Sequence, residues 1–233
     1  MTSRPRKCGL SQSSSHKTGG LTPRASLVCR NQEFTLILSL YFFIGIGQNS
    51  NKLKAFQENF EIIRKEAIEL ASDLDEWEED DHFLVRSGSF HAIGLFLYGK
   101  KKHETCSKTP KACKLLKAFK ESSTCKKCIS KIVLVEPGTH QIRHNGPTNE
   151  RLRAVLPLQA ENGKAKLFIG KHEKELRENE LVVFDESFEN ALSNDSGNNL
   201  LLLEMDFNHP DLTDREKNTE SFSDQVKSKF VLY

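Results

Sequence analysis

The stretch VEPGTHQIRHNGPTNERLRAVLPL, residues 135–158, decides the expected fold. Prolines and glycines flank its two histidines on both sides, which opposes a helix through them. We therefore expect His140 and His144 to lie on a strand or at its end. Four residues apart on a strand, they share a face but stand about 13 Å apart, too far to bind one metal ion. A metal at His144 would need a second ligand from a later strand, and without one His144 is a hydrogen-bonded structural residue.

Five short runs from residue 131 onward are rich in apolar and β-branched residues. They read KIVLVEP (131–137), RAVLPLQ (153–159), KAKLFIG (164–170), ELVVFDE (180–186) and NLLLLEMDF (199–207). Turns rich in Gly, Asn, Asp and Glu separate them, and no helical pattern intervenes. Such regular spacing predicts an antiparallel β-sandwich or jelly roll.

The N-terminal half adds helices to this mainly β fold. Residues 53–70 repeat apolar side chains every three or four positions, which predicts one amphipathic helix. Residues 83–98 are typical of short strands with bends, and ACKLLKAFK (112–120) predicts a short helix. With 233 residues, we expect one domain over 51–212, a targeting or disordered segment over 1–50, and a polar tail over 213–233 with a helical turn or two in DQVKSKF (224–230).

An apolar run, FTLILSLYFFIGIG, occupies residues 34–47. It is shorter than the roughly 17 to 25 residues that span a bilayer. Six basic residues between Arg4 and Arg30 precede it, with no acidic residue among them. This pattern fits a signal or signal-anchor segment, and the alternative is a buried strand or hairpin. Through this run a membrane is a candidate partner.

Cysteine spacing leaves three interpretations open. Six cysteines are present: Cys8 and Cys29 near the start, and Cys106, Cys113, Cys125 and Cys128 in a cluster. The cluster matches no common zinc spacing, and a redox CxxC needs a βαβ setting that SSTCKKCISK does not offer. A disulfide, at least between Cys106 and Cys113, is favoured and would indicate an oxidising compartment.

Charge is balanced overall, with a formal net charge of +2, but it is unevenly distributed. Residues 73–81 are almost wholly acidic, whereas residues 100–131 hold eleven lysines against Glu104 and Glu121. Solvated surface segments are the simplest interpretation. No nucleic-acid partner is expected, because only Phe119 could stack on a base among those lysines.

The motifs PGTHQIRHNGPTNERLR, LVVFDESFEN and DFNHPDL, in this order, resemble the catalytic domain of the aspartyl/asparaginyl β-hydroxylases. The similarity runs from about Phe56 through ACKLLKAFKESSTC to about Leu212. The resemblance implies a double-stranded β-helix, a distorted jelly roll, with a disulfide matching Cys106 and Cys113. It also implies iron(II) and 2-oxoglutarate as cofactors, residence in the endoplasmic reticulum, and hydroxylation of Asp or Asn in EGF-like domains.

The same resemblance assigns the site residues. His144 matches the first of two histidines that hold iron, and Asn190 occupies the position of the second. Arg153 matches an arginine that reaches a carboxylate of 2-oxoglutarate, while Val155 and Leu200 stand where the family has a histidine and a second arginine. Further matches lie on the substrate side, at Arg151, and in the turn that frames the site, at Asp185, Ser187 and Phe188. The other histidines of the β region, which would have to move to replace the missing ligand, are His140, His172 and His209.

A neutral amide is a poor iron(II) ligand, and leucine leaves one end of a dianion uncompensated. We therefore expect a family member whose hydroxylase activity is weakened or lost. The alternative is a non-catalytic relative that binds EGF-like or other protein partners. A third hypothesis is a basic adaptor acting through residues 100–131. The sequon Asn194-Asp195-Ser196 could carry a glycan in a secretory compartment.

Overall fold

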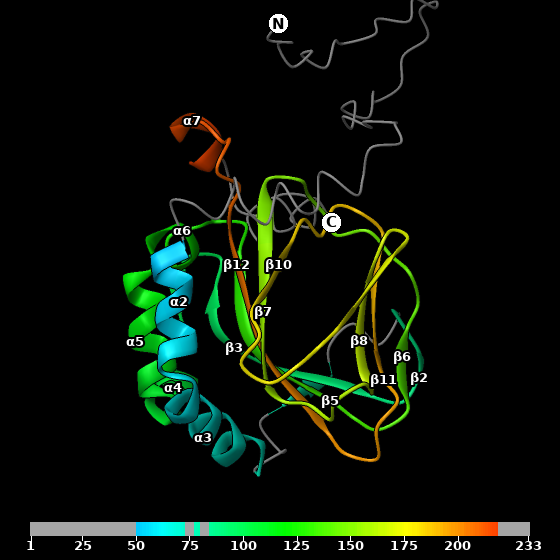
Figure 1. Cartoon of the computed structure of the whole chain (residues 1–233). Coiled ribbons are helices and arrows are strands. Elements are labelled where there is room, and N and C mark those ends of the chain that lie inside the picture. Colours follow the sequence, from blue (N-terminus) through cyan, green and yellow to red (C-terminus); the bar gives the residue numbers. More distant parts are fainter. Residues whose placement is uncertain (1–49, 73–76, 80–83, 219–233) are drawn as a thin grey trace, which may run out of the picture.

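The computed structural model of the protein describes residues 50–72, 77–79 and 84–218 (Figure 1). Two antiparallel sheets pack face to face, and helices cover the outer face of the larger sheet. This arrangement is the mainly β jelly roll that the strand spacing predicts and the double-stranded β-helix that the resemblance implies, with α-helices on its N-terminal side.

The larger sheet has the strand order β1-β3-β5-β12-β7-β10, with β4 paired to β3. Its strands are β1 (Glu78–Glu79), β3 (Phe90–Leu97), β4 (Lys100–Lys101), β5 (Ile129–Val135), β7 (Arg151–Gln159), β10 (Val182–Phe184) and β12 (Leu200–Asn208). The smaller sheet has the order β2-β6-β11-β8-β9. It contains β2 (Val85–Ser87), β6 (Thr139–Gln141), β8 (Ala165–Ile169), β9 (His172–Glu175) and β11 (Asn190–Asn194). From β5 onward the chain passes from one sheet to the other between β5 and β6, β7 and β8, β9 and β10, and β11 and β12, and β2 makes an earlier excursion into the smaller sheet between β1 and β3.

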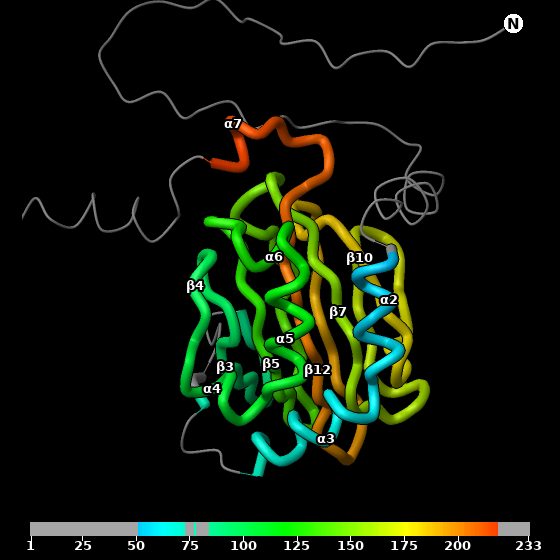
Figure 2. The backbone as a smooth tube through the Cα atoms, turned by 90° about the vertical axis from the view of Figure 1, so that its left-hand side faces the viewer, coloured from blue at the N-terminus to red at the C-terminus, as the bar shows by residue number. Residues whose placement is uncertain are grey.

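The helices are α2 (Ser50–Glu58), α3 (Phe60–Ala71), α4 (His103–Lys108), α5 (Pro110–Ala118), α6 (Lys120–Ser123) and α7 (Asp214–Lys217). Figure 2 shows α2, α3, α5 and α6 lying over the larger sheet, on the side turned toward the viewer. The prediction of one continuous helix over 53–70 is wrong, because the helix breaks at Asn59 (φ −110°, ψ 19°). The Asn59 side chain donates to the carbonyl of Ala55 (2.7 Å), a local bond that competes with helix continuation. The apolar positions that defined the pattern are nevertheless all buried.

Two apolar cores result from strand alternation. On β12, Leu201, Leu203 and Met205 pack toward the helices, whereas Leu200 and Leu202 pack between the two sheets. Alternation therefore also turns the acidic side chains further along β12 into the space between the sheets. This inner space is where the candidate site lies.

All five predicted strand runs form strands, as β5, β7, β8, β10 and β12. The strand expected at His140 is also present, as β6. The sequence missed β9 and β11, whose residues are mostly polar. The expected helical turns in 224–230 and the whole segment 1–49, including the apolar run 34–47, lie outside the described residues. Within the described ranges, no helix has the length and apolar character needed to cross a bilayer.

Candidate functional site

His144 and Asn190 lie directly opposite each other where the smaller sheet begins. The His144 amide donates to the Asn190 carbonyl (3.0 Å), and the Asn190 amide donates back to the His144 carbonyl (2.7 Å). The fold thus brings together the two positions that the resemblance assigns to metal ligands.

The Asn190 side chain is buried and holds the turn that precedes β11. Its Nδ2 donates to the carbonyl oxygens of Phe188 (2.9 Å), Glu186 (3.0 Å) and His144 (3.3 Å). Three acceptors around one atom fix the orientation of the amide, because an oxygen in that place would face three oxygens. An amide NH₂ has no lone pair to give a metal, so the group that faces His144 is a donor and not a ligand.

The His144 ring keeps one nitrogen available. Its Nδ1 donates to the carbonyl of Ile142 (3.0 Å), which leaves the lone pair of the neutral ring on Nε2. The described residues contain no group of three or more His, Cys, Asp or Glu side chains that could hold a metal ion. One imidazole beside an amide donor does not fit iron(II).

The remaining histidines of the β region do not supply the missing ligand. His140 Nε2 lies 3.1 Å from Asp195, and His172 opens β9 at the edge of the smaller sheet. His209 follows β12 and accepts a hydrogen bond at Nδ1 from the Asp211 amide (3.2 Å). Replacement of the second ligand by another histidine therefore finds no support in the structure.

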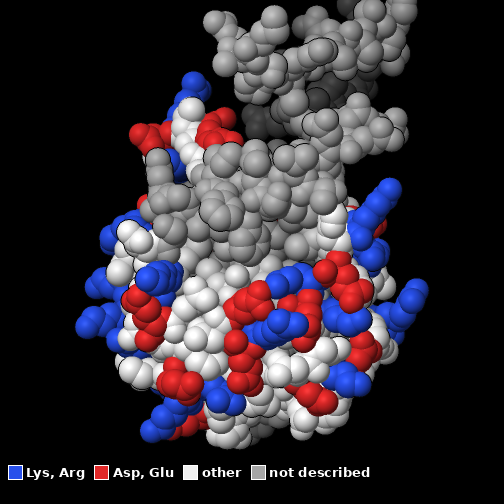
Figure 3. All heavy atoms as spheres, viewed as in Figure 1, with Lys and Arg blue, Asp and Glu red and all other residues white. Residues whose placement is uncertain are grey.

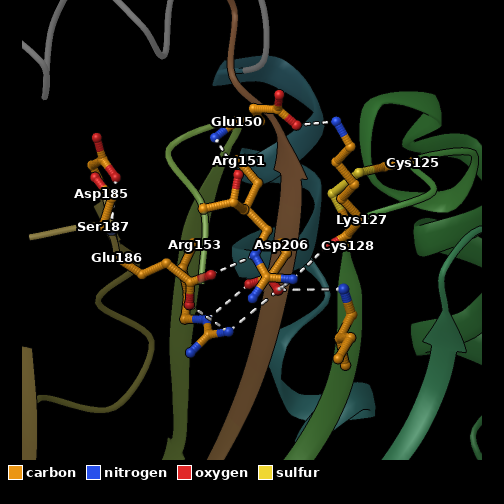
Figure 4. Close-up of polar contacts among 12 residues, drawn as sticks. Cys125, Lys127, Cys128, Glu150, Arg151, Arg153, Asp185, Glu186, Ser187 and Asp206 are labelled. Atoms are coloured by element: carbon orange, nitrogen blue, oxygen red, sulfur yellow. Dashed lines mark hydrogen bonds and ion pairs between the residues drawn. A yellow bond between two sulfur atoms is a disulfide. The ribbon is translucent and has the colours of Figure 1, made fainter. Parts of the chain in front are cut away.

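Arg153, the expected cosubstrate residue, is already occupied by carboxylates of its own chain (Figure 4). Its Nε and Nη2 donate to the two oxygens of Asp206 (2.8 and 3.2 Å). Nη2 also lies 2.7 Å from Glu186, and Nη1 lies 3.8 Å from Glu204. A bound 2-oxoglutarate would need a bidentate pair between its carboxylate and the guanidinium of Arg153. Asp206 already forms this pair.

Arg151 is buried in the same group and does not reach the surface as a substrate-side residue would. Its Nε donates to Glu186, its Nη1 donates to the carbonyl of Lys127, and Nη1 lies 3.1 Å from Asp206. The Lys127 ammonium in turn pairs with Glu150 at the rim of the group. The expected role of Arg151 in holding substrate is therefore not supported by its position.

Three cations and three carboxylates make up this buried group, which we call the ion cluster: Arg151, Arg153, Lys131, Glu186, Glu204 and Asp206. All six come from the inner faces of β5, β7 and β12 or from the turn after β10. Their formal charges cancel. A dianionic ligand would therefore add two uncompensated charges here.

Ionisation within the cluster follows from burial and from the shared arginines. Burial opposes ionisation of Asp206, but Arg153 and Arg151 outweigh it and hold the pKa of Asp206 below its ordinary value. Burial raises the pKa of Glu186, the charge of Asp206 adds to this effect, and the arginines offset it only in part. Burial alone would lower the pKa of Arg153, yet Asp206, Glu204 and Glu186 raise it well above its ordinary value. The first proton that the pair of carboxylates takes up thus goes to Glu186.

Leu200 and Val155 fill the rest of the expected cosubstrate pocket with apolar side chains. Both are buried, at 1% and 2% exposure, in the core between the two sheets. Leu202 and Val135 belong to the same core. Among the described residues no cation lines this core to meet a distal carboxylate, so the pocket does not fit 2-oxoglutarate.

The turn that frames the site keeps its expected shape. Asp185 accepts from the Ser187 amide (2.9 Å), and the Phe188 amide donates to the Asp185 carbonyl (3.3 Å). Gly146 packs against this turn so closely that an added Cβ would lie 2.6 Å from the Glu186 side chain. These contacts make the turn residues structural.

Two disulfides join the four clustered cysteines. Cys106 pairs with Cys113, as predicted, and ties α4 to α5. Cys125 pairs with Cys128, a bond that the sequence did not predict. The second pair closes the turn whose carbonyl, at Lys127, accepts from Arg151.

The sequon asparagine, Asn194, is fully buried at the end of β11. Its Nδ2 donates to the carbonyls of Asn198 (2.9 Å), Val135 (3.0 Å) and Glu136 (3.2 Å), and its Oδ1 accepts from Ser196. A glycan on Nδ2 would abolish this arrangement. The folded domain therefore has no open acceptor at the sequon, contrary to the expectation from the motif.

Sequence reasoning missed the acidic half of the ion cluster. Glu204 and Asp206 interrupt a run of leucines at alternate positions, and Glu186 adjoins the framing turn. Alternation alone would have turned Glu204 and Asp206 inward with Leu200 and Leu202. That signal was available in the sequence.

Residues 57–210 match a family model described as "Aspartyl/Asparaginyl beta-hydroxylase". The chain is 30% identical over 168 residues to the aspartyl/asparaginyl beta-hydroxylases of Mus musculus and Homo sapiens, which covers 71% of this chain and 22% of each relative. It therefore spans about a fifth of the length of these relatives. Among solved structures it is similar to a Pseudomonas putida prolyl-4-hydroxylase, with 18% identity, 64% of this chain and 87% of that chain covered, and a TM-score of 0.43. A cupin-like protein from Thermotoga maritima shares 12% identity over 62% of this chain and 93% of that chain, with a TM-score of 0.36.

Proposed function

The chain belongs to the aspartyl/asparaginyl β-hydroxylase family. We propose that it has kept the family fold but not the reaction that depends on iron and 2-oxoglutarate. On this proposal it acts by binding a protein partner. EGF-like domains are the partner class that the family resemblance suggests, and the two disulfides favour an oxidising compartment such as the lumen of the endoplasmic reticulum.

The hydrogen bonding of Asn190 carries the proposal. The side chain at the second ligand position spends its nitrogen on three backbone carbonyls. Turning the amide to offer its oxygen would break these three hydrogen bonds and set an acceptor against carbonyl oxygens. Each lost hydrogen bond costs about 0.5–1.5 kcal/mol. The amide oxygen would be a weak neutral ligand for iron(II) and would not replace the missing imidazole.

The ion cluster supports the same conclusion for the cosubstrate. To bind 2-oxoglutarate, Arg153 would have to release Asp206 or Glu186 into a buried site. Removing one partner from a buried ion pair costs about 3–5 kcal/mol. The new carboxylate would regain only one such pair, and its distal end would face Leu200.

An anaerobic titration of the full chain with iron(II) and 2-oxoglutarate tests the proposal. The readout is the visible charge-transfer band of a chelated complex, recorded for wild type, Asn190→His and His144→Ala. We expect no band in wild type. Asn190→His should bind iron(II), and the double variant Asn190→His/His144→Ala should not. Binding is detected by the paramagnetic broadening of histidine resonances.

A wild-type band that His144→Ala abolishes would sink the proposal and favour a working or weakened hydroxylase. Unchanged fluorescence of Trp77, the single tryptophan of the chain, checks that each variant is folded. The partner class has a separate test, which is calorimetric titration of the full chain with a disulfide-bonded EGF-like domain. Absence of saturable binding at millimolar concentration would exclude EGF-like domains as the partner.

A further inference from the structure

Six lysines on the helical side of the molecule form what we call the lysine strip: Lys100, Lys101, Lys102, Lys114, Lys117 and Lys120. All six are exposed. The strip begins on β4, passes the start of α4, and continues over α5 to α6. The only acidic residues of 100–126 are Glu104 and Glu121, and Glu121 is already paired with Lys52 (2.7 Å).

Several surface cations of the described chain form ion pairs with neighbouring carboxylates, and the lysines of the strip do not. Within the described part of the chain, no carboxylate lies within ion-pair distance of any of the six. Elsewhere on the surface such partners are common. The pairs are Lys54–Glu58, Lys65–Glu69, Lys166–Glu173, Lys174–Glu180 and Arg177–Glu175. The positive charge of the strip is therefore not neutralised by its own surroundings.

The fold gathers the strip on one side. In Figure 2, β4, α4, α5 and α6 all lie on the face turned toward the viewer, outside the larger sheet. In Figure 3, lysine and arginine side chains project along the left margin, where α5 lies, while the two signs of charge alternate over the front. On α5, the buried residues Ala112, Cys113 and Leu116 face the core, which leaves the lysines on the outer side. The elements that carry the strip thus lie on one side of the molecule.

The chemistry of the strip selects a partner. Protein interfaces have an apolar centre and are depleted in lysine, whereas the exposed large apolar side chains of the described chain are Ile62, Ile68 and Ile142, all outside the strip. Single-stranded nucleic acids need aromatic side chains for stacking. Among the Phe, Tyr and Trp residues of 98–120, Phe119 is buried and Tyr98 is only half-exposed. The negative lipid surface lies on the cytoplasmic leaflet, on the other side of the membrane from a compartment that forms disulfides.

We propose that the lysine strip binds a linear sulfated polysaccharide. Ammonium groups act as compact point charges and suit sulfate groups spaced along a flexible chain, and lysine-rich segments are known as heparin-type patches. The strip lies on the helical side of the larger sheet, away from His144 and the ion cluster. The inference is therefore independent of the function proposed for the site.

The test is the binding of the full chain to a size-defined heparin oligosaccharide, measured calorimetrically over a range of salt concentrations. The triple variant Lys114→Gln/Lys117→Gln/Lys120→Gln removes half of the strip and keeps good helix formers. We expect the affinity to fall at least tenfold. The slope of log K against log salt should become shallower by about 2 to 3, as expected when three released counter-ions are lost.

A control variant with the same net charge, Lys54→Gln/Lys65→Gln/Lys166→Gln, changes lysines outside the strip. It should bind as wild type does. The proposal fails if the control loses as much affinity as the strip variant, because net charge alone would then explain binding. It also fails if heparin does not bind at low salt, or if polyglutamate of the same charge binds as tightly, because the partner would then be an acidic polypeptide.

Discussion

Asp206→Ala should be among the most damaging single changes in the chain. The carboxylate is 0% exposed and accepts from Arg153 Nε (2.8 Å), Arg153 Nη2 (3.2 Å) and the Ile129 amide (3.3 Å), with Arg151 Nη1 at 3.1 Å. Its removal leaves two guanidinium groups between the sheets with one carboxylate fewer than they need. Breaking a buried pair in this way costs about 3–5 kcal/mol, a large part of the roughly 5–15 kcal/mol that stabilises a domain.

Urea unfolding followed by tryptophan fluorescence measures this cost, because Trp77 is buried in the helix-side core and bonded to the Leu70 carbonyl (3.2 Å). With a denaturant slope of about 2 kcal/mol/M, the midpoint should fall by about 1.5–2.5 M. The exposed Asp214→Ala should change stability by no more than about 0.5 kcal/mol. In a double-mutant cycle, Asp206→Ala and Arg153→Ala should be coupled by about 1–3 kcal/mol. A loss below about 1 kcal/mol for Asp206→Ala would refute the reasoning, because Arg153 would then not depend on Asp206 and would be free for an external anion.

Three further outcomes follow from the contacts. Glu66→Ala should lower the free energy of unfolding by about 1–2 kcal/mol in the same assay, because the buried carboxylate accepts from the first amides of α5 (2.7 and 3.1 Å). The control is Glu61→Ala, at an exposed position, and equal effects of the two changes would contradict this role. The pKa of Glu186 is raised in the folded state. The folded chain releases the proton of this carboxyl at a higher pH than the unfolded chain, which releases it near pH 4.3. Wild type should therefore lose stability relative to Glu186→Gln as pH rises from that value through the folded pKa, and a pH-independent difference would contradict the shift. Chain produced in secretory cells should carry no glycan on Asn194 by intact-mass analysis, and a glycosylated, folded product would contradict the burial of its amide.

Much of the fold could be predicted from local pattern. The five apolar runs became strands because each is long enough and apolar enough to be recognised without its neighbours. β11 was missed because three of the five residues of NALSN are polar, and its burial depends on pairing with β8 and β6 on both sides. The break at Asn59 was missed because helical periodicity continues through it, while a side-chain bond to Ala55 redirects the backbone.

The site was predicted in position but not in its bonding. The resemblance placed His144 beside Asn190, and the fold does so. What could not be read from the sequence is that β12 lies between β5 and β7, because strand order is a property of the whole chain. That order sets Asp206 opposite Arg153 across neighbouring strands. Without the strand order, the sequence predicts that Asp206 and Arg153 both face inward but not that they form an ion pair.

The ion cluster also explains why one substitution should not restore the family reaction. A guanidinium buried between two sheets must have a counter-charge, whether from a ligand or from the protein. In this chain Asp206 and Glu186 supply it, so Arg153 is stable without any cosubstrate. Adding an imidazole at position 190 would change the metal site but would leave the cluster neutral and Leu200 apolar. Iron binding and 2-oxoglutarate binding are thus separate losses, and recovery of the first in Asn190→His should not bring back the second.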